Sequence, residues 1–329
     1  MFRILHDTNY DFIRWWKVMA AITVAFIVLG LGSLAIKPPN WSIEFTGGTL
    51  MQLEFTQPPD VGEIRSTLDN AGIQGAEIQQ FGTNREFTVR VQDKAAVARQ
   101  SKGAESIAVT IGRVLKDKFG ANNMTVKRTE GVGPRVGEEL KRGAIIAILL
   151  SFLITLVYLS IRFEWRFAAA AVIATSHDVF TTIAFLKLMH LEISLTVVAG
   201  LLTVLGYSLN DTIIIFDRVR EDLRKGRKET LYQTLNRSIN ETLPRSVLTH
   251  VTVLAATLSL LIFAGEVIRP FAWVMAFGII TGTFSSIYVA GPVLLWIEHK
   301  WPRKTGARPS SSTATPTSRT QRSAATATR

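Results

Sequence analysis

The chain has 329 residues, of which 47% are hydrophobic and only 19% charged, and its mean hydropathy of +0.23 is high for a water-soluble protein of this length. It contains no Cys, which excludes disulfide bonds, thiolate zinc sites, iron–sulfur clusters and cysteine nucleophiles. The formal charge of +11 would suit a nucleic acid or an anionic membrane, and the positions of the basic residues decide between these partners.

Six long apolar segments predict membrane-spanning helices, because about 20 residues at 1.5 Å each cross the hydrocarbon layer. They cover residues 18–36, 143–161, 167–186, 193–215, 247–264 and 271–297. Ser33 and Ala35 would suit a signal-peptide cleavage site, but the first segment exceeds the apolar core of about 7 to 15 residues typical of signal peptides. We therefore expect the first segment to remain as an anchor.

The basic residues of the short connections predict the orientation, because Lys and Arg collect on the cytosolic side of a membrane. They fall before the first span, between the second and third, after the fourth and after the sixth, for example Arg14, Arg162, Arg220 and Lys300. Residues 1–17 and 298–329 are therefore expected in the cytosol. Topology then accounts for most of the positive charge, and we expect no nucleic-acid partner.

Residues 37–142 are predicted to form a domain outside the cytosol. Apolar and polar residues alternate as in strands over 43–45, 50–55, 77–81 and 86–91, and 124–127 predicts a last strand. Helical stripes occur at 61–71 and 107–120. The order strand, helix, strand, strand, helix, strand predicts a ferredoxin-like α+β fold. The fold class is thus a polytopic α-helical membrane protein with one such domain.

The cytosolic loop 217–246 contains apolar residues every four positions, which predict a short amphipathic helix. They are Leu231, Leu235, Ile239 and Leu243. A helix lying in the membrane interface is the simplest interpretation, and a docking surface for a partner is the alternative. From Arg303 the tail is rich in Ser, Thr and Ala and has no acidic residue, so its composition predicts disorder, and we assign residues 298–329 to this disordered basic tail.

Motifs of soluble enzymes are missing from the sequence. No G-x-x-x-x-G-K-[ST] segment occurs, and the glycines at 131, 133 and 137 lack G-x-G-x-x-G spacing and precede a membrane span. A hinge is the better interpretation of these glycines. We therefore expect no covalent catalysis, no cofactor and no ATP hydrolysis, so any work must draw on another energy source.

Two aspartates inside apolar spans are the strongest functional signal, because an ionisable side chain at the bilayer centre costs about 2.5–3.5 kcal/mol and is usually functional and paired. Asp178, preceded by His177, lies eleven residues into the third span, about 16 Å deep. Asp211, preceded by Asn210, lies in the fourth span. Both are candidates for a proton path.

Arg245 follows Pro244, which we expect in the first turn of the fifth membrane helix. Arg245 is either an ordinary cytosolic-side arginine or a counter-charge for Asp211. In the second case, opening the pair would let Asp211 take up a proton, and closing it would release that proton.

Each polar residue of the spans also has a purely structural interpretation. His177 and His250 are possible proton relays, although packing is the simpler role for His250. Asp178 could instead be a polar tie between helices, bonded to hydroxyls such as those of Thr175 or Thr181. Small residues on the last helix predict close helix packing, namely Gly278, Gly282, Ser285 and Ser286.

Residues 206–221, with the sequence GYSLNDTIIIFDRVRE, closely resemble the signature segment of the SecF family of bacterial protein-export membrane proteins. Further segments resemble that family in the same order: Phe45-Thr46-Gly47-Gly48-Thr49, Gly133 to Gly137, His177-Asp178-Val179 and Gly282 to Ser286. The glycines of the first of these permit a bulge or a close backbone approach, and a plain tight turn is the alternative. The resemblance covers the chain up to about Trp301.

The resemblance implies a subunit of the RND-type transporter superfamily in the bacterial inner membrane that works with SecD. The pair would assist the SecYEG channel, with YajC as a further candidate partner, by using the proton-motive force, while the outer domains engage the unfolded polypeptide. Asp211 matches the proton-path aspartate of the family and Arg245 its arginine. The family often has threonine and a small hydroxyl where Ser246 and His250 stand here, so sodium is the alternative to the proton as coupling ion.

Two other functions remain possible at this point. A passive membrane scaffold would gather partner subunits and use its buried acids as structural ties. An RND-type exporter of lipid or small molecules would share the architecture. Substitution of Asp211 by Asn separates an ion-driven subunit from a scaffold.

Overall fold

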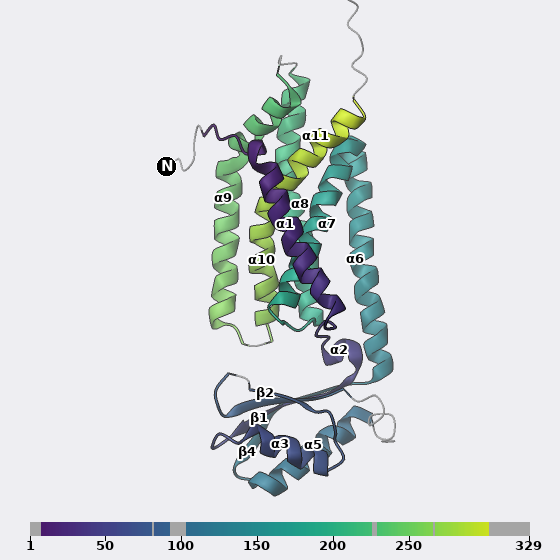
Figure 1. The fold of residues 1–329 in the computed structure, drawn as a ribbon, viewed down its shortest axis with the longest axis vertical. Helices are drawn as coiled ribbons and strands as arrows, with labels where there is room; N and C mark the ends of the chain where they lie inside the picture. The colour runs from purple at the N-terminus through teal and green to yellow at the C-terminus, as the bar shows by residue number, and fades with distance from the viewer. Residues whose placement is uncertain (1–7, 81, 93–102, 226–228, 266, 303–329) are drawn as a thin grey trace, which may run out of the picture.

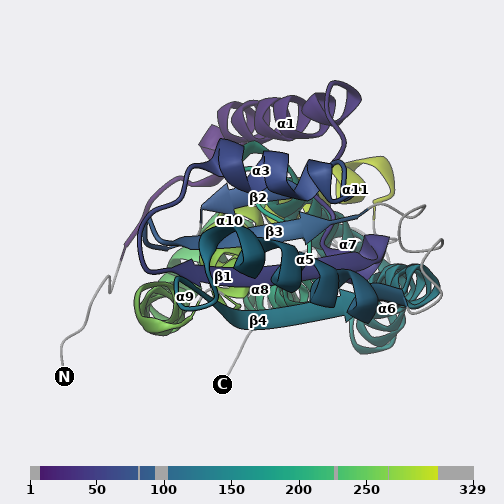
Figure 2. The ribbon, with the colours of Figure 1, turned by 90° about the horizontal axis from the view of Figure 1, so that it is seen from below.

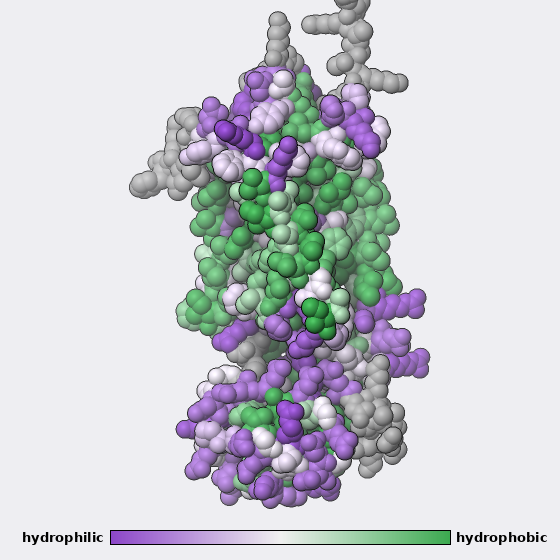
Figure 3. Space-filling view, in the orientation of Figure 1, coloured by the Kyte–Doolittle hydropathy of each residue, from purple (hydrophilic) through white to green (hydrophobic). Residues whose placement is uncertain are grey.

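A bundle of long helices stands on a small α+β domain in the computed structural model, which describes residues 8–80, 82–92, 103–225, 229–265 and 267–302 (Figure 1). The bundle is apolar around its middle, and polar residues cover the α+β domain and the opposite end (Figure 3). This distribution is that of a membrane protein with one domain outside the bilayer.

Six helical segments of the described chain are long and apolar enough to cross a membrane. The helices are α1 (Trp16–Gly32), α6 (Pro134–Arg162), α7 (Trp165–Leu188), α8 (Leu195–Arg224), α9 (Leu231–Phe263) and, as one span, α10 (Arg269–Ser285) with α11 (Gly291–Lys300). Short 3-10 helices flank α1 at Ile13–Trp15 and Ser33–Ala35, and a π-helical turn, Ser286–Ala290, joins α10 to α11. The prediction of six spans is confirmed.

Helices α7, α8 and α10 form the buried centre of the bundle, whereas α1, α6 and α9 are largely exposed. Small residues allow the close packing of α10 on α8: a methyl group added to Gly278 would clash with Val204, and one added to Gly282 would lie 3.1 Å from Ser208 Cβ. The predicted packing role of these glycines is confirmed. The exposed apolar faces of α1, α6 and α9 are available for lipid or for a partner subunit.

Helix α9 differs from the prediction, because the expected interfacial helix and the fifth span form one continuous helix that contains Pro244 in its interior. The interpretation as a separate helix lying in the interface was therefore wrong, as was the placement of Pro244 in a first turn. Leu235 and Ile239 are buried in the bundle core instead of facing lipid. Their four-residue spacing suits a helix packed on protein as well as one lying on a membrane.

Two local contacts hold the first turns of α9. Thr230 and Gln233 form a capping box, in which each side chain bonds the backbone N–H of the other. The N-terminal segment docks alongside: Asn240 Nδ2 donates to Tyr10 O at 2.8 Å, and Asn236 Oδ1 accepts from Phe12 N at 2.9 Å. Tertiary contacts of this kind make the amphipathic segment part of the bundle.

The α+β domain runs through α2 (Ile43–Thr46), β1 (Gly48–Phe55), α3 (Val61–Asn70), β2 (Glu77–Gln80), β3 (Glu86–Val91), α5 (Gly103–Phe119) and β4 (Met124–Val132). Its four strands are antiparallel in the order β2-β3-β1-β4. Helices α3 and α5 cover one face of the sheet, and the other face is turned to the bundle (Figures 1 and 2). The predicted ferredoxin-like fold is confirmed.

The alternating pattern of the strands explains this layering. On β1, Met51, Leu53 and Phe55 are buried beneath the helices, with at most 2% of their surface exposed. Their counterparts on α3 are Ile64 and Leu68, which lie one turn apart on one face. The intervening residues of β1 point toward the bundle, so the second face of the sheet is more polar.

Three boundaries of the domains differ from the sequence prediction. Residues 43–45 form the helical turn α2 instead of a strand, because the Gly47 N–H donates to Ile43 O at 2.8 Å and Gly47 then ends the turn at φ +73°. Helix α6 begins at Pro134, so residues 134–142 belong to a membrane helix that extends toward the domain. At the C-terminus, residues 298–302 are ordered, since Arg166 Nε donates to Trp301 O at 3.0 Å. The remainder of the predicted disordered tail, from 303, lies outside the described residues.

Candidate functional site

Asp178 lies at the centre of the bundle with none of its surface exposed. Ser208 of α8 and Ser285 of α10 both donate to Asp178 Oδ2, Ser285 at 2.7 Å, and His177 Nδ1 lies 3.1 Å from Oδ1. The carboxylate thus joins three helices. A buried charge without such bonds would be strongly unfavourable, so the two serines stabilise Asp178 in this position.

The interpretation of Asp178 as an interhelical tie fits this geometry, but with other hydroxyls than those predicted. Thr175 and Thr181 donate to backbone carbonyls of their own helix, at 2.8 Å to Ala171 O and 2.7 Å to His177 O. Hydroxyls at helix positions commonly bond the carbonyl four residues back. Ser285, attributed to packing alone, bonds the carboxylate as well.

Asp211 lies in the C-terminal half of α8 and is 4% exposed. The Ser246 hydroxyl of α9 donates to Asp211 Oδ1, whereas Oδ2 is buried and has no hydrogen-bond partner among the described residues. The next residue, Thr212, is bonded to Ser286 at 3.0 Å. Helix α8 is therefore held on both sides of Asp211 while one carboxylate oxygen stays open.

Two aromatic side chains lie one helical turn from this contact. Tyr207 precedes Asp211 by four residues and His250 follows Ser246 by four, and their ring centroids are 5.3 Å apart with the rings nearly perpendicular. The Tyr207 hydroxyl and His250 Nδ1 are both buried without a hydrogen-bond partner in the described part of the chain. The packing role expected for His250 is present, beside polar atoms that remain unsatisfied.

Arg245 does not contact Asp211 in this conformation, so their predicted pairing stays a prediction. Among the described residues, Asp211 has no ion pair with Lys or Arg, and Arg245 is exposed on α9. It lines a hollow of about 390 Å³ together with Asp217, Arg218 and Glu221. The reason is helical geometry: Arg245 lies about 100° around α9 from Ser246, so only Ser246 faces α8.

Asn210 is likewise exposed on α8, pointing away from the buried face that carries Asp211. The structure therefore brings His177 and Asp178 together and places Asp211 separately beside Ser246. Sequence reasoning did not identify Ser208 as a partner of Asp178. Its spacing of three residues from Asp211, on the same apolar helix, was an available signal.

The segment Phe45-Thr46-Gly47-Gly48-Thr49 approaches the start of α6 so closely that Gly47 cannot carry a side chain. A methyl group on Gly47 would lie 2.7 Å from Pro134 Cα, and one on Gly137 would lie 2.9 Å from Gly47 N. Gly48, at φ +136°, abuts the carbonyl of Val91. Of the two interpretations offered for this motif, the close backbone approach is present. The irregularity of the β1–β4 pairing lies further along, between Gln52 and Leu53.

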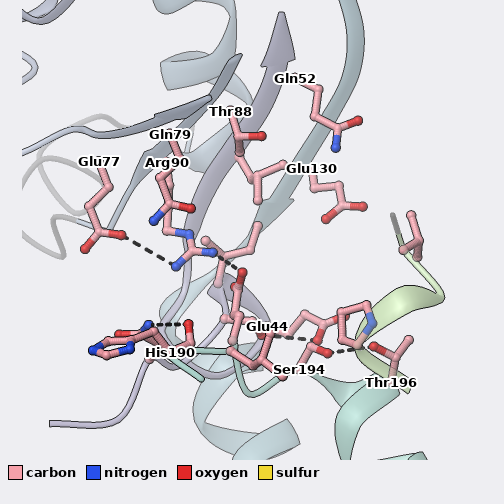
Figure 4. A pocket seen from close by; sticks show the side chains of 18 of the residues that line it. Glu44, Gln52, Glu77, Gln79, Thr88, Arg90, Glu130, His190, Ser194 and Thr196 are labelled. Carbon is pink, nitrogen blue, oxygen red and sulfur yellow. Dashed lines mark hydrogen bonds and ion pairs between the residues drawn. The ribbon is translucent and has the colours of Figure 1, made fainter. Parts of the chain in front are cut away.

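A cleft of about 600 Å³ separates the open face of the sheet from the bundle. Figure 4 shows Gln52, Thr88 and Glu130 on the sheet side, and Glu44, Ser194 and Thr196 on the opposite wall. Because polar side chains line much of this cleft, the open face of the sheet is not packed on the bundle through an apolar core.

An ion pair crosses the cleft. Arg90 of β3 pairs with Glu192 of the connection between α7 and α8, and lies 3.6 Å from Glu77. Burial raises the pKa of Glu192 above its ordinary value of 4.5, and the attraction of Arg90 offsets this only in part. The ion pair therefore sits in a partly desolvated site.

Comparison with known proteins places this arrangement in a family. The family model described as "Protein export membrane protein SecD/SecF, C-terminal" matches residues 111–300, and the "SecD/SecF GG Motif" model matches residues 32–59. The second match contains Gly47 and Gly48.

Curated relatives match over nearly the whole chain. The protein translocase subunit SecF of Gemmatimonas aurantiaca is 62% identical over 305 residues, covering 92% of this chain and 91% of the relative. SecF of Vibrio alginolyticus is 40% identical over 307 residues, covering 92% of this chain and 96% of the relative.

A solved structure shows the same fold. The crystal structure of SecDF, a translocon-associated membrane protein from Thermus thermophilus, aligns with a TM-score of 0.78 and 34% identity over 91% of this chain. The chain spans 40% of the length of that SecDF chain. A structure of SecDF in a super-membrane-facing form aligns with a TM-score of 0.65. The chain therefore belongs to the SecD/SecF family of protein-export membrane proteins, as a SecF-type subunit of the export machinery.

Proposed function

We propose that this subunit uses the movement of protons through its membrane half to move the α+β domain, as one half of a pair with SecD. In this proposal the membrane is the bacterial inner membrane, both termini are cytosolic and the α+β domain is periplasmic. The single observation that carries it is Asp211, a buried carboxylate bonded through one oxygen only.

Protonation of such a group changes the forces between helices. An ionised Asp211 attracts the Ser246 hydroxyl strongly, because hydrogen bonds to a charged acceptor contribute about 1.5–3 kcal/mol. A protonated Asp211 loses most of that preference and can donate through its second oxygen. Moving one charge across the membrane is worth about 2.3 kcal/mol per 100 mV, which is of the size needed to shift the α8–α9 contact between two states.

The exposed positions of Asn210 and Arg245 support a path completed by the partner. Asn210 directly precedes Asp211 on α8, and Arg245 directly precedes Ser246, the partner of Asp211, on α9. Both side chains are nevertheless exposed on this chain. We propose that they face SecD, and that Arg245 approaches Asp211 in a second conformation. The pair His177 and Asp178 would then hold the helix packing about which this movement occurs.

The remaining partners follow from the family. The SecYEG channel, the translocating polypeptide and, as a further candidate, YajC would be engaged outside the helix core described above. A proton is the coupling ion that best suits a carboxylate held by one hydroxyl, since a sodium ion requires several oxygen ligands. Among the described residues, the side-chain oxygen bonded to Asp211 is the Ser246 hydroxyl.

Substitution of Asp211 by Asn tests the proposal in membrane vesicles containing this subunit, SecD and the channel. We expect secretion to become independent of the membrane potential and of the pH gradient, while expression and assembly are retained. The matched control is Asp217→Asn, on the same helix but exposed and paired with Arg220 at 3.1 Å. Unaltered potential-dependent secretion by Asp211→Asn would instead identify the subunit as a passive scaffold.

A further inference from the structure

The segment that leads from α1 into the α+β domain is attached to the connection between α7 and α8. Ile193 N donates to Asn40 O at 2.7 Å, and Ser42 N donates to Ile193 O at 2.9 Å. These two bonds form a parallel bridge between Trp41 and Ile193. The entrance of the domain and the start of α8 thus share one short piece of backbone pairing.

Glu44 extends this attachment to the first residue of α8. Its Oε2 accepts from Leu195 N at 2.6 Å and from the Ser42 hydroxyl at 3.2 Å. Leu195 is the first helical residue after the N-cap, Ser194. A carboxylate at this position satisfies one of the unbonded N–H groups of the first turn and interacts favourably with the helix dipole.

On its other side, the same segment cannot move independently of the sheet. Only three residues separate Glu44 from Gly48, where β1 begins. Gly47 is wedged against Pro134 and Gly137 at the start of α6. A pull on Glu44 is therefore transmitted to β1 and to α6 with little slack.

Helix α8 connects this contact to the Asp211 site. The helix is continuous from Leu195 to Arg224. Asp211 lies 16 residues after Leu195, which corresponds to about 24 Å along the helix axis. A displacement of α8 at Asp211 must therefore appear at Leu195, because a regular helix is stiff over this length.

We propose that Glu44 is a positioning residue that ties the first turn of α8 to the α+β domain, so that displacement of α8 at Asp211 moves the domain. The inference rests on the proposed function, which supplies the displacement. The polar cleft of about 600 Å³ beside the contact favours this role, because the sheet and the bundle are not packed together across it. The ion pair of Arg90 with Glu192 forms a second attachment to the same connection.

A distance measurement tests the attachment directly. The chain has no Cys, so spin labels can be placed at Ser66→Cys on α3 and Ile268→Cys at the start of α10, both exposed. In the full chain with SecD in lipid, we expect one narrow distance distribution for the wild type. Glu44→Leu should broaden or shift it, whereas Glu44→Gln, which keeps an acceptor oxygen, should retain it.

A second variant removes the donor instead of the acceptor. Leu195→Pro deletes the N–H that Glu44 binds. Proline is well tolerated at the first position of a helix. The residue before it, Ser194, already has the extended backbone that proline requires there, with φ −118° and ψ 173°. It should reproduce the effect of Glu44→Leu. The control is Glu54→Leu, an acid of β1 that pairs with Lys127 at 2.7 Å within the sheet.

The outcomes separate this inference from the proposed function. An unchanged distance distribution in Leu195→Pro and in Glu44→Leu overturns the role of Glu44, whatever the secretion result. Broadening in both variants, with the wild-type distribution restored by Gln at position 44, supports it. The distances are measured without a gradient, so a failure of the proposed function would appear only as normal potential-dependent secretion by Asp211→Asn.

Discussion

The two buried aspartates of the membrane half differ in how completely their charge is satisfied. Asp178 receives two serine hydroxyls from two other helices and a histidine from its own. Asp211 receives a single serine hydroxyl, and its second oxygen has no partner in the described structure. A fully bonded carboxylate stabilises one arrangement of helices, whereas a half-bonded one can exchange partners at low cost. We therefore expect Asp178 to serve packing and Asp211 to serve movement.

The largest expected effect is on stability, upon removal of Asp178. Asp178→Ala leaves the Ser208 hydroxyl buried without this acceptor, at about 1–3 kcal/mol, and leaves Ser285 with only its 3.2 Å bond to Gly282 O. Thermal unfolding in lipid nanodiscs should show a clear loss of stability for Asp178→Ala and a smaller loss of stability for Asp211→Ala. Equal losses would remove the distinction between the two sites.

The serine partners sharpen the comparison. Ser285→Ala removes a 2.7 Å bond to Asp178 and should cost about 1.5–3 kcal/mol of unfolding free energy. Ser246→Ala should change the dependence of secretion on pH more than it changes stability, because Asp211 is already half-bonded. Parallel thermal unfolding and secretion measurements on both variants check this. The reverse pattern would assign the movement to Asp178.

Close packing around Asp178 predicts an effect of intermediate size. The methyl group of Gly282→Ala would press on Ser208, 3.1 Å away at Cβ, and displace its bond to Asp178. Overpacking of this kind costs about 1–3 kcal/mol. Gly206→Ala on α8 is the control, because the added methyl meets no atom within 4 Å. If Gly282→Ala proves as stable as the control, the serine contact does not depend on that packing.

The smallest expected effect on stability concerns a third acid, Glu192, which lies in the connection between α7 and α8. Because its pKa is raised, the folded chain holds the proton more tightly than the unfolded chain. The favourable contribution of Glu192 protonation to the free energy of unfolding is complete below about pH 4.5. It is lost as the pH rises through the raised pKa of the folded chain. Glu192→Gln should remove this pH dependence, with a change below about 1 kcal/mol near neutral pH because the group is part-exposed.

Thermal unfolding of the wild type and Glu192→Gln between about pH 4 and pH 8 tests the sign. Stability that rises with pH in the wild type alone would contradict it. Arg90→Gln is the companion variant, and it should be more destabilising because Glu192 and Glu77 then lose their shared cation.

Much of the architecture was predictable from local patterns. Apolar runs longer than the bilayer require membrane helices, and the two-residue alternation of β1 with the helical stripe at Ile64 and Leu68 requires a sheet with helices on one face. Asp178 and Asp211 were identified because a charge in an apolar run is unfavourable wherever it folds. These conclusions depend on properties of consecutive residues, which the sequence states directly.

The partners of those aspartates were decided only by the tertiary structure. Arg245 and Ser246 are adjacent in sequence, yet a rotation of about 100° per residue turns one outward and the other toward Asp211. Ser285 is 107 positions from Asp178, and the two meet where α10 packs on α7 and, through Gly278 and Gly282, closely on α8. The contact of Glu44 with Leu195 joins residues 151 positions apart. Periodicity determines which residues share a helix face, but only the packing of whole elements determines what that face meets.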